Sequence, residues 1–239
     1  MEVAASAYDS LRIDEAKMIQ NRLRENIELL PLSQKIHTIA GADISLNRFS
    51  EVIYAGIVVL RYDDLKPIAC SLVQGITRFP YIPGFLAFRE VPALVQALEQ
   101  MPFQPDVIMV DGHGIAHPRR MGIAAHLGSL TGLATLGCAK KLLFGKYQEP
   151  ENSKGAYEPI KDKEETIGYT LRTKNRVKEV FISPGNKMTL ENSLQVAIHS
   201  TGNYRIPEPT RRAHEFVNLF RTGRLQAGYQ EFADQPSLF

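Results

Sequence analysis

The sequence has no tryptophan, only two cysteines among 239 residues, and little excess of charge of either sign. The two thiols, Cys70 and Cys138, are too few and too far apart for a disulfide framework, so we expect both to be reduced and buried. No run approaches the ~18 consecutive apolar residues of a membrane helix, and the N-terminus lacks the basic and apolar regions of a secretory signal. These absences predict a soluble, cytoplasmic protein without a membrane partner.

Proline (14 residues) and glycine (17 residues) are not abundant, which excludes a collagen-like or low-complexity chain. Hydrophobic residues make up 44% of the chain, enough for a large core, and this excludes wholesale disorder. The formal net charge of +2 neither requires nor excludes a nucleic-acid partner. Because no segment separates two apolar cores, we expect residues 1–239 to form a single domain.

The apolar pattern predicts an α/β chain with a mixed sheet. Apolar residues at spacings of three and four predict an N-terminal helix over 13–30, which Pro31 ends. Three strand-like runs with short polar connections predict an antiparallel meander, after which strands and helices alternate. The predicted strands are 36–45, 52–60, 67–76, 106–110, 133–139, 166–172 and 178–185, and the later helices are 88–98, 121–131, 189–200 and 208–222.

Two segments fall outside this pattern. Residues 149–165 contain six acids, three lysines and two prolines, with few large apolar groups. We expect a surface excursion there, and not a domain linker, because strand-like segments lie on both sides. The tail from about Gly228 is expected to be frayed.

Two aspartates stand where apolar strands end. Asp43 ends the first strand, where a charged group needs a partner or a metal, and a capping turn is an equally good explanation. Asp111 follows Val-Ile-Met-Val and precedes Gly112 and Gly114, at the strand end where α/β sheets bind ligands. An Asp-Gly turn is the alternative, but the histidines and arginines in the same loop favour a functional role.

A stiff loop leads into a helix that begins with an acid. Tyr81 lies between Pro80 and Pro83, and these prolines hold the aromatic side chain in a defined direction. A rigid, projecting aromatic is a candidate wedge for unstacking bases, and a hydrophobic latch onto the core is the alternative. Glu90 lies in the first turn of the following helix, where an acid also compensates the helix dipole.

Asp43, Glu90 and Asp111 are candidate ligands for Mg²⁺, which prefers hard oxygen ligands. Two such ions can activate water and neutralise the leaving oxygen in phosphodiester hydrolysis. The spacing of the three acids is not diagnostic without the fold. His214 is a candidate proton carrier or metal neighbour, and Lys140 is a candidate phosphate contact. An exposed helical histidine and a solvated strand end are the respective alternatives.

Basic residues are distributed unevenly along the chain. Residues 205–224 contain five arginines and two glutamates. We expect these arginines to form one basic face for phosphates together with a second set of basic residues. That second set comprises Arg119, Arg120, Lys140, Lys141 and Lys146.

From roughly Gly41 to Arg224 these segments resemble the endonuclease V family of inosine-directed nucleases, which have a ribonuclease H-like fold. The matching motifs are Asp43-Ile44-Ser45, Pro80-Tyr81-Ile82-Pro83-Gly84 with Phe88-Arg89-Glu90, Val110-Asp111-Gly112-His113-Gly114 with His117-Pro118-Arg119, Gly137-Cys138-Ala139-Lys140, Ser183-Pro184-Gly185, and Tyr204-Arg205-Ile206-Pro207-Glu208-Pro209 with Arg211 and His214. The chain departs from the family at Asn186, where histidine often follows Ser-Pro-Gly.

The resemblance implies a mixed central sheet of three antiparallel strands and then parallel strands, flanked by helices. It implies that Asp43, Glu90 and Asp111 bind Mg²⁺, with Mn²⁺ as a substitute. It also implies that His214 completes this site or moves protons, and that Lys140 lies near the scissile phosphate.

The resemblance also implies a set of residues that bind a flipped base. Tyr81 would belong to the wedge, and His117 would lie near the scissile phosphate. Hypoxanthine would enter a pocket built partly from backbone groups near Gly84 and Gly112, with Pro83 beside it.

The activity implied is hydrolysis of the second phosphodiester bond 3′ to inosine in DNA repair, which leaves 3′-hydroxyl and 5′-phosphate ends. The expected partner is DNA with deoxyinosine or other deaminated bases, and the expected state is a monomer. Two alternatives stay open: an inosine-specific endoribonuclease on the same fold, and a non-catalytic binder of flipped bases. The three acids favour catalysis, because a binder has no need to concentrate negative charge where phosphates dock.

Overall fold

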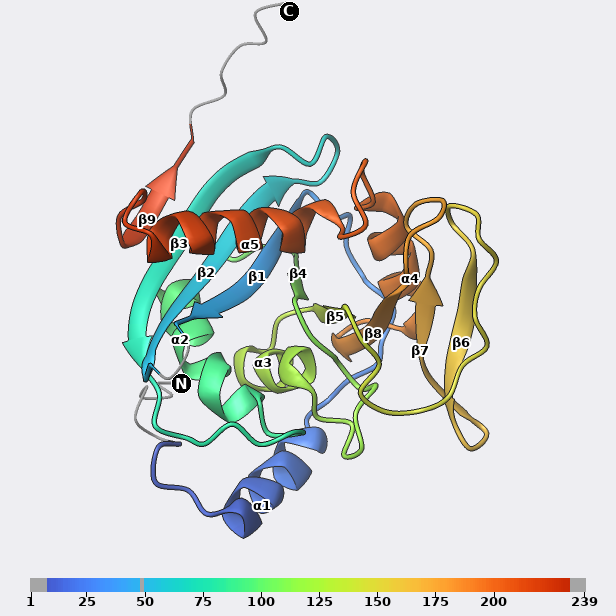
Figure 1. The fold of residues 1–239 in the computed structure, drawn as a ribbon, viewed down its shortest axis with the longest axis horizontal. Helices are drawn as coiled ribbons and strands as arrows, with labels where there is room; N and C mark the ends of the chain where they lie inside the picture. The colour runs from blue at the N-terminus through green and yellow to red at the C-terminus, as the bar shows by residue number, and fades with distance from the viewer. Residues whose placement is uncertain (1–7, 48–49, 233–239) are drawn as a thin grey trace, which may run out of the picture.

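The computed structural model describes residues 8–47 and 50–232. Within these ranges, nine strands form one mixed sheet in the order β6-β7-β8-β5-β4-β1-β2-β3-β9 (Figure 1). The sheet continues without a break from the edge strand β6 to the edge strand β9, and helices lie on both of its faces.

The antiparallel meander forms one half of the sheet. β1 (Thr38–Leu46), β2 (Val52–Arg61) and β3 (Pro67–Ile76) pair in sequence, while β4 (Val107–Val110) and β5 (Thr135–Ala139) follow β1 in parallel. β1, β2, β4 and β5 are largely buried along their length, which explains their nearly continuous apolar sequences. This arrangement confirms the predicted mixed sheet.

Helices cover both faces of the sheet. α4 (Leu190–His199) and α5 (Glu208–Arg221) pack against one face, and α2 (Ala87–Glu99) and α3 (Ile123–Thr131) pack against the other. Side chains alternate between the two faces along each strand, so Asp43 in β1 points to the α5 side. In the described part of the chain, no helix is long and apolar enough to span a bilayer.

The N-terminal helix α1 (Ile13–Arg24) ends earlier than the predicted 13–30. The chain beyond it is held by tertiary hydrogen bonds: the Glu28 N–H donates to the Asn186 side chain at 2.9 Å, and the Lys187 N–H donates to the Glu28 carbonyl at 2.6 Å. These contacts replace the helical bonds that local periodicity favours.

Two predictions at the sheet edges are wrong. Part of the predicted surface excursion is a strand, β6 (Tyr157–Asp162), because it pairs with β7 (Glu165–Leu171) and buries Ile160. Part of the predicted frayed tail is also a strand, β9 (Gly228–Glu231), which pairs antiparallel with β3. The tail beyond residue 232 lies outside the described residues.

Candidate active site

Asp43 lies inside β1 and not at its end as predicted, and Asp111 directly follows the neighbouring parallel strand β4. Ala42 of β1 pairs with Val110 of β4, and the backbone N–H of Asp111 donates to the Ala42 carbonyl at 3.0 Å. Asp43 is 7% exposed. The fold therefore brings Asp43 and Asp111 together, although 68 positions separate them in the sequence.

Glu90, in the first turn of α2, completes an acidic group with the two aspartates. Burial raises its pKa to about 8, and the charges of Asp43 and Asp111 add to this effect, while Arg89 opposes it. Burial and the charge of Asp43 also raise the pKa of Asp111, although Lys140 opposes the rise. The neighbouring aspartates therefore disfavour the ionised form of Glu90, and Asp43 disfavours that of Asp111.

Two basic side chains face this acidic group. The Lys140 ammonium, just after β5, forms an ion pair with Asp111. Nδ1 of His214, on α5, lies 2.8 Å from a carboxylate oxygen of Asp43. That hydrogen bond raises the pKa of His214, and the Asp111 contact raises the pKa of Lys140 against the lowering effect of burial. The structure thus places all five predicted catalytic residues in one group.

The donor chemistry of this group fits a divalent cation. Carboxylate oxygens are hard ligands, and a cation would relieve the mutual repulsion that raises the pKa values of Glu90 and Asp111. As arranged among residues 8–47 and 50–232, no three acidic, histidine or cysteine side chains enclose an ion. Instead, Lys140 contributes positive charge beside Asp111, and His214 lies within hydrogen-bond distance of Asp43.

A cavity of about 620 Å³ adjoins the acidic group, within the range of small-molecule sites. Its lining contains all five predicted substrate-binding residues, Tyr81, Pro83, Gly84, Gly112 and His117, together with Asp111 and Lys140. Sequence reasoning missed the apolar side chains that complete the lining, Ile82, Leu86, Met121, Ile123, Leu142 and Leu143. They carry no motif, because they are ordinary apolar residues that only the fold collects.

The loop before α2 divides its aromatic residues between the core and the surface. Phe79 and Phe85 are buried, and the Arg89 side chain donates to the Phe79 carbonyl. Tyr81 is 72% exposed at the rim of the cavity. Phe79 and Phe85 therefore hold the loop against the core, as the latch alternative predicts, while Tyr81 projects from it, as the wedge prediction requires.

His117 is buried with both ring nitrogens engaged by backbone groups. Nδ1 accepts from the Arg119 N–H at 3.1 Å and the Met121 N–H at 3.3 Å, so Nε2 carries the proton and donates to the Gly84 carbonyl at 3.0 Å. Burial and the Arg119 charge lower its pKa to about 4. In this arrangement His117 holds the Gly84 loop and has no free nitrogen for a phosphate.

The predicted basic face is partly neutralised. Arg120 pairs with Asp162 and Glu165 at 2.6 Å each. On α5, Arg211 and Arg212 both pair with the glutamates of the same helix. Local charge counts overstate the positive potential because they cannot show which charges pair.

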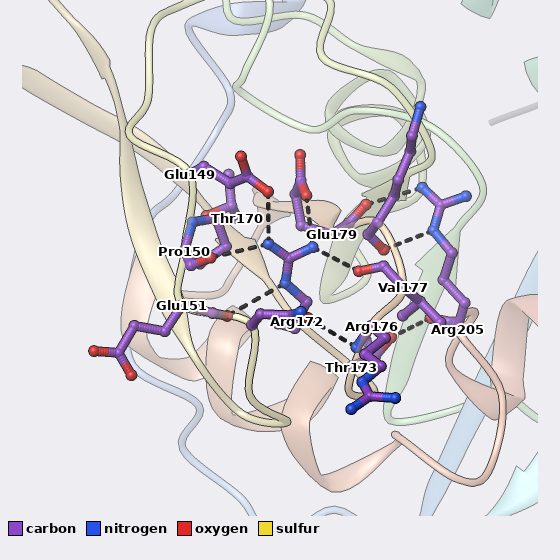
Figure 2. A network of polar contacts seen from close by, with 12 residues as sticks. Glu149, Pro150, Glu151, Thr170, Arg172, Thr173, Arg176, Val177, Glu179 and Arg205 are labelled. Atoms are coloured by element: carbon purple, nitrogen blue, oxygen red, sulfur yellow. Dashed lines mark hydrogen bonds and ion pairs between the residues drawn. The ribbon is translucent and has the colours of Figure 1, made fainter.

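The acidic segment is anchored by a buried arginine (Figure 2). Arg172 contacts Glu149 at 3.0 Å and Glu179 at 3.2 Å, and it also donates to the Pro150 carbonyl at 2.9 Å. Beside it, Arg205 donates to the backbone carbonyl of Glu179 at 2.9 Å. Arg205 also donates to the backbone carbonyl of Lys140 at 2.9 Å, so this network reaches the catalytic group.

Asn186, where the chain departs from the family motif, is 2% exposed. Its amide donates to the carbonyls of Gly128 at 3.0 Å and Leu133 at 3.4 Å, and its oxygen accepts from Glu28. These partners assign the side chain to the packing of α3 and of the segment after α1 against β8 (Val180–Asn186). Asn186 does not line the cavity.

Carboxylates brought together by adjacent strands, a lysine beside them and an adjoining cavity on a mixed α/β sheet are typical of nucleases. A sequence model of the Endonuclease V family matches residues 21–215. The chain belongs to this family.

Individual relatives agree with the family match. Endonuclease V of Trichormus variabilis is 41% identical over 209 residues, which cover 87% of this chain and 95% of the relative. The crystal structure of Endonuclease V from Streptomyces avermitilis superposes with a TM-score of 0.85 at 36% identity, covering 90% and 95% of the two chains. Ciona intestinalis Endonuclease V, in complex with a 24-mer DNA containing an inosine followed by a ribo-adenosine, gives a TM-score of 0.77 at 25% identity, covering 88% and 98%.

Proposed function

We propose that the protein is a Mg²⁺-dependent endonuclease that recognises hypoxanthine in DNA. It hydrolyses the second phosphodiester bond 3′ to the lesion and leaves 3′-hydroxyl and 5′-phosphate ends, as a step in DNA repair. The observation that carries this proposal is the group of three carboxylates, two of them with raised pKa values, beside a cavity of about 620 Å³ that is large enough for a purine base. Family membership and the inosine-containing DNA bound by the Ciona relative support the choice of substrate.

In this proposal Asp43, Glu90 and Asp111 hold the ion, with Mn²⁺ as a substitute. When bound, the ion supplies positive charge to the phosphate and a more acidic water. Lys140 neutralises charge on the phosphate oxygens next to Asp111. His214, oriented by Asp43, holds a proton at Nδ1 next to the carboxylates.

The cavity selects the base. Tyr81 at the rim stacks where the flipped base leaves the helix. The backbone near Gly84 and Gly112, with Pro83 beside it, contacts the base itself. Gly84 has φ +81°, a left-handed conformation that glycine adopts without strain, so a side chain at this position is disfavoured.

We also propose that the protein works as a monomer in the cytoplasm, a reducing compartment that keeps thiols free. Cys70 and Cys138 are both free and buried, in agreement with that environment.

The decisive experiment is a cleavage assay with Mg²⁺ on inosine-containing DNA and RNA, each single- and double-stranded. We expect nicking of the inosine strand of DNA and no cleavage of matched adenine controls. Cleavage of RNA alone would establish the endoribonuclease alternative. Specific binding without cleavage would establish the non-catalytic binder.

Asp43→Ala and Asp111→Asn test the ion site. Each removes a carboxylate from the group, so we expect cleavage to fall about a thousandfold while binding to inosine DNA is retained. Nicking kinetics and a gel-shift assay measure the two properties separately. Undiminished nicking by both variants would contradict the ion assignment.

A further inference from the structure

One buried polar side chain of α1 contacts two segments that line the cavity. Gln20 is fully buried and belongs to a helix that packs on α3, outside the two layers that cover the sheet. Its amide nitrogen donates to the Gly84 carbonyl at 3.0 Å and to the Met121 carbonyl at 3.3 Å. Its amide oxygen accepts from Nε of Arg119.

The two carbonyls belong to different walls of the cavity. Gly84 lies in the loop that carries Tyr81, and Met121 lies in the loop that follows β4. The Gly84 carbonyl also accepts from His117 at 3.0 Å and from Arg119 at 2.8 Å. The Arg119 guanidinium in turn lies 4.3 Å from the centre of the Phe85 ring.

Only a carboxamide supplies this pattern at one buried position. Both N–H groups of Gln20 donate, one to each wall, while the oxygen accepts from Arg119. A carboxylate of the same shape would place negative charge against two carbonyl oxygens. An apolar side chain would leave the Met121 carbonyl without this donor.

We propose that Gln20 is a positioning residue for base selection, because its carboxamide fixes the two cavity walls relative to each other and thereby the position of Tyr81. This inference rests on the proposed function, in which the cavity receives the flipped base. The proposal gives α1 a role in selecting the base, and the candidate metal ligands do not have this role.

Gln20→Met and Gln20→Glu test this proposal against Ser129→Ala. The Ser129 hydroxyl donates to the Leu23 carbonyl at 2.7 Å, so its removal loosens α1 without touching the cavity walls. We expect the ratio of kcat/KM for inosine over adenine strands to fall about tenfold in both Gln20 variants and to stay unchanged in Ser129→Ala. Methionine preserves the buried volume, so Gln20→Met gives the result if Gln20→Glu does not fold. Equal ratios in Gln20→Met and Ser129→Ala would overturn the proposal.

A second measurement does not depend on activity. Because the sequence has no tryptophan, Tyr81→Trp introduces a single fluorescent reporter on the loop. We expect Gln20→Met to lower the fluorescence anisotropy of this reporter and Ser129→Ala to leave it unchanged. If the wild type fails to discriminate inosine, the proposed function fails, and the anisotropy still decides whether Gln20 holds the loop. Unchanged anisotropy in Gln20→Met would overturn the positioning role.

Discussion

Substitution of Tyr81 can change base recognition without changing the stability of the fold. It is 72% exposed and lies at the cavity rim, so Tyr81→Ala removes little buried surface. We expect the free energy of unfolding to change by less than about 0.5 kcal/mol, while preference for inosine over adenine strands falls. Competition cleavage assays measure the preference, and Mg²⁺ titration of cleavage should be unaltered. Loss of Mg²⁺ response with intact preference would contradict this role.

His126, which is not part of the catalytic group, makes the stability of the fold depend on pH. It is fully buried, contacts the Tyr8 hydroxyl at 3.1 Å, and has a pKa lowered by burial to about 3. The folded state therefore binds fewer protons than the unfolded state between pH 6.5 and 3, and stability falls as the pH falls through that window.

We expect His126→Asn to remove this component, which amounts to about 1 kcal/mol per pH unit between pH 6 and 5. Urea unfolding at several pH values, compared between variant and wild type, measures the difference in slope. His117, whose pKa is lowered to about 4, should retain its own share in both proteins. Parallel pH profiles would contradict the assignment.

At the scale of elements, α5 lies so close to β1 that a glycine is required beneath it. A Cβ at Gly41 would lie 1.8 Å from the Pro209 carbonyl oxygen, which belongs to the backbone of α5. Because His214 on the same helix reaches Asp43, this close approach sets the geometry of the catalytic group.

Gly41→Ala should therefore lift α5, cost about 1–3 kcal/mol of stability and reduce cleavage. Gly75→Ala on β3 is the matched control, since its nearest neighbours lie at ordinary contact distances of 3.7 and 3.8 Å. Thermal unfolding and nicking rates on the two variants measure both effects. Equal behaviour of the two alanine variants would contradict the role of the close approach.

Elements with a pronounced apolar pattern were predictable from the sequence, whereas elements without one were not. The helices α2 to α5 and the strands β1 to β5, β7 and β8 follow apolar periodicity and turn residues. β6, β9 and the residues after α1 take their conformation from β7, β3 and Asn186, which no local pattern identifies. The catalytic residues were predictable because motifs carry them, but Gln20 lies in an unremarkable amphipathic helix.

At the scale of the whole molecule, a net charge of +2 conceals how many of its cations are already paired. Arg120, Arg211 and Arg212 are engaged by acids, and Arg205 by carbonyls. Lys141, which lines the cavity, and Lys146 are exposed, and within residues 8–47 and 50–232 neither has an ion-pair partner.

Counterion release from DNA should therefore depend on Lys141 and Lys146 and not on Arg211 and Arg212. We expect Lys141→Ala and Lys146→Ala each to reduce the slope of log Kd against log salt by about one, because each removes one phosphate contact. Arg212→Ala should leave the slope unchanged, because its charge is already balanced by Glu208 and Glu215. Fluorescence anisotropy of labelled inosine DNA from low to moderate salt gives the three slopes. A reduced slope only in Arg212→Ala would place the DNA across α5 instead, and would show that its ion pairs exchange for phosphates on binding.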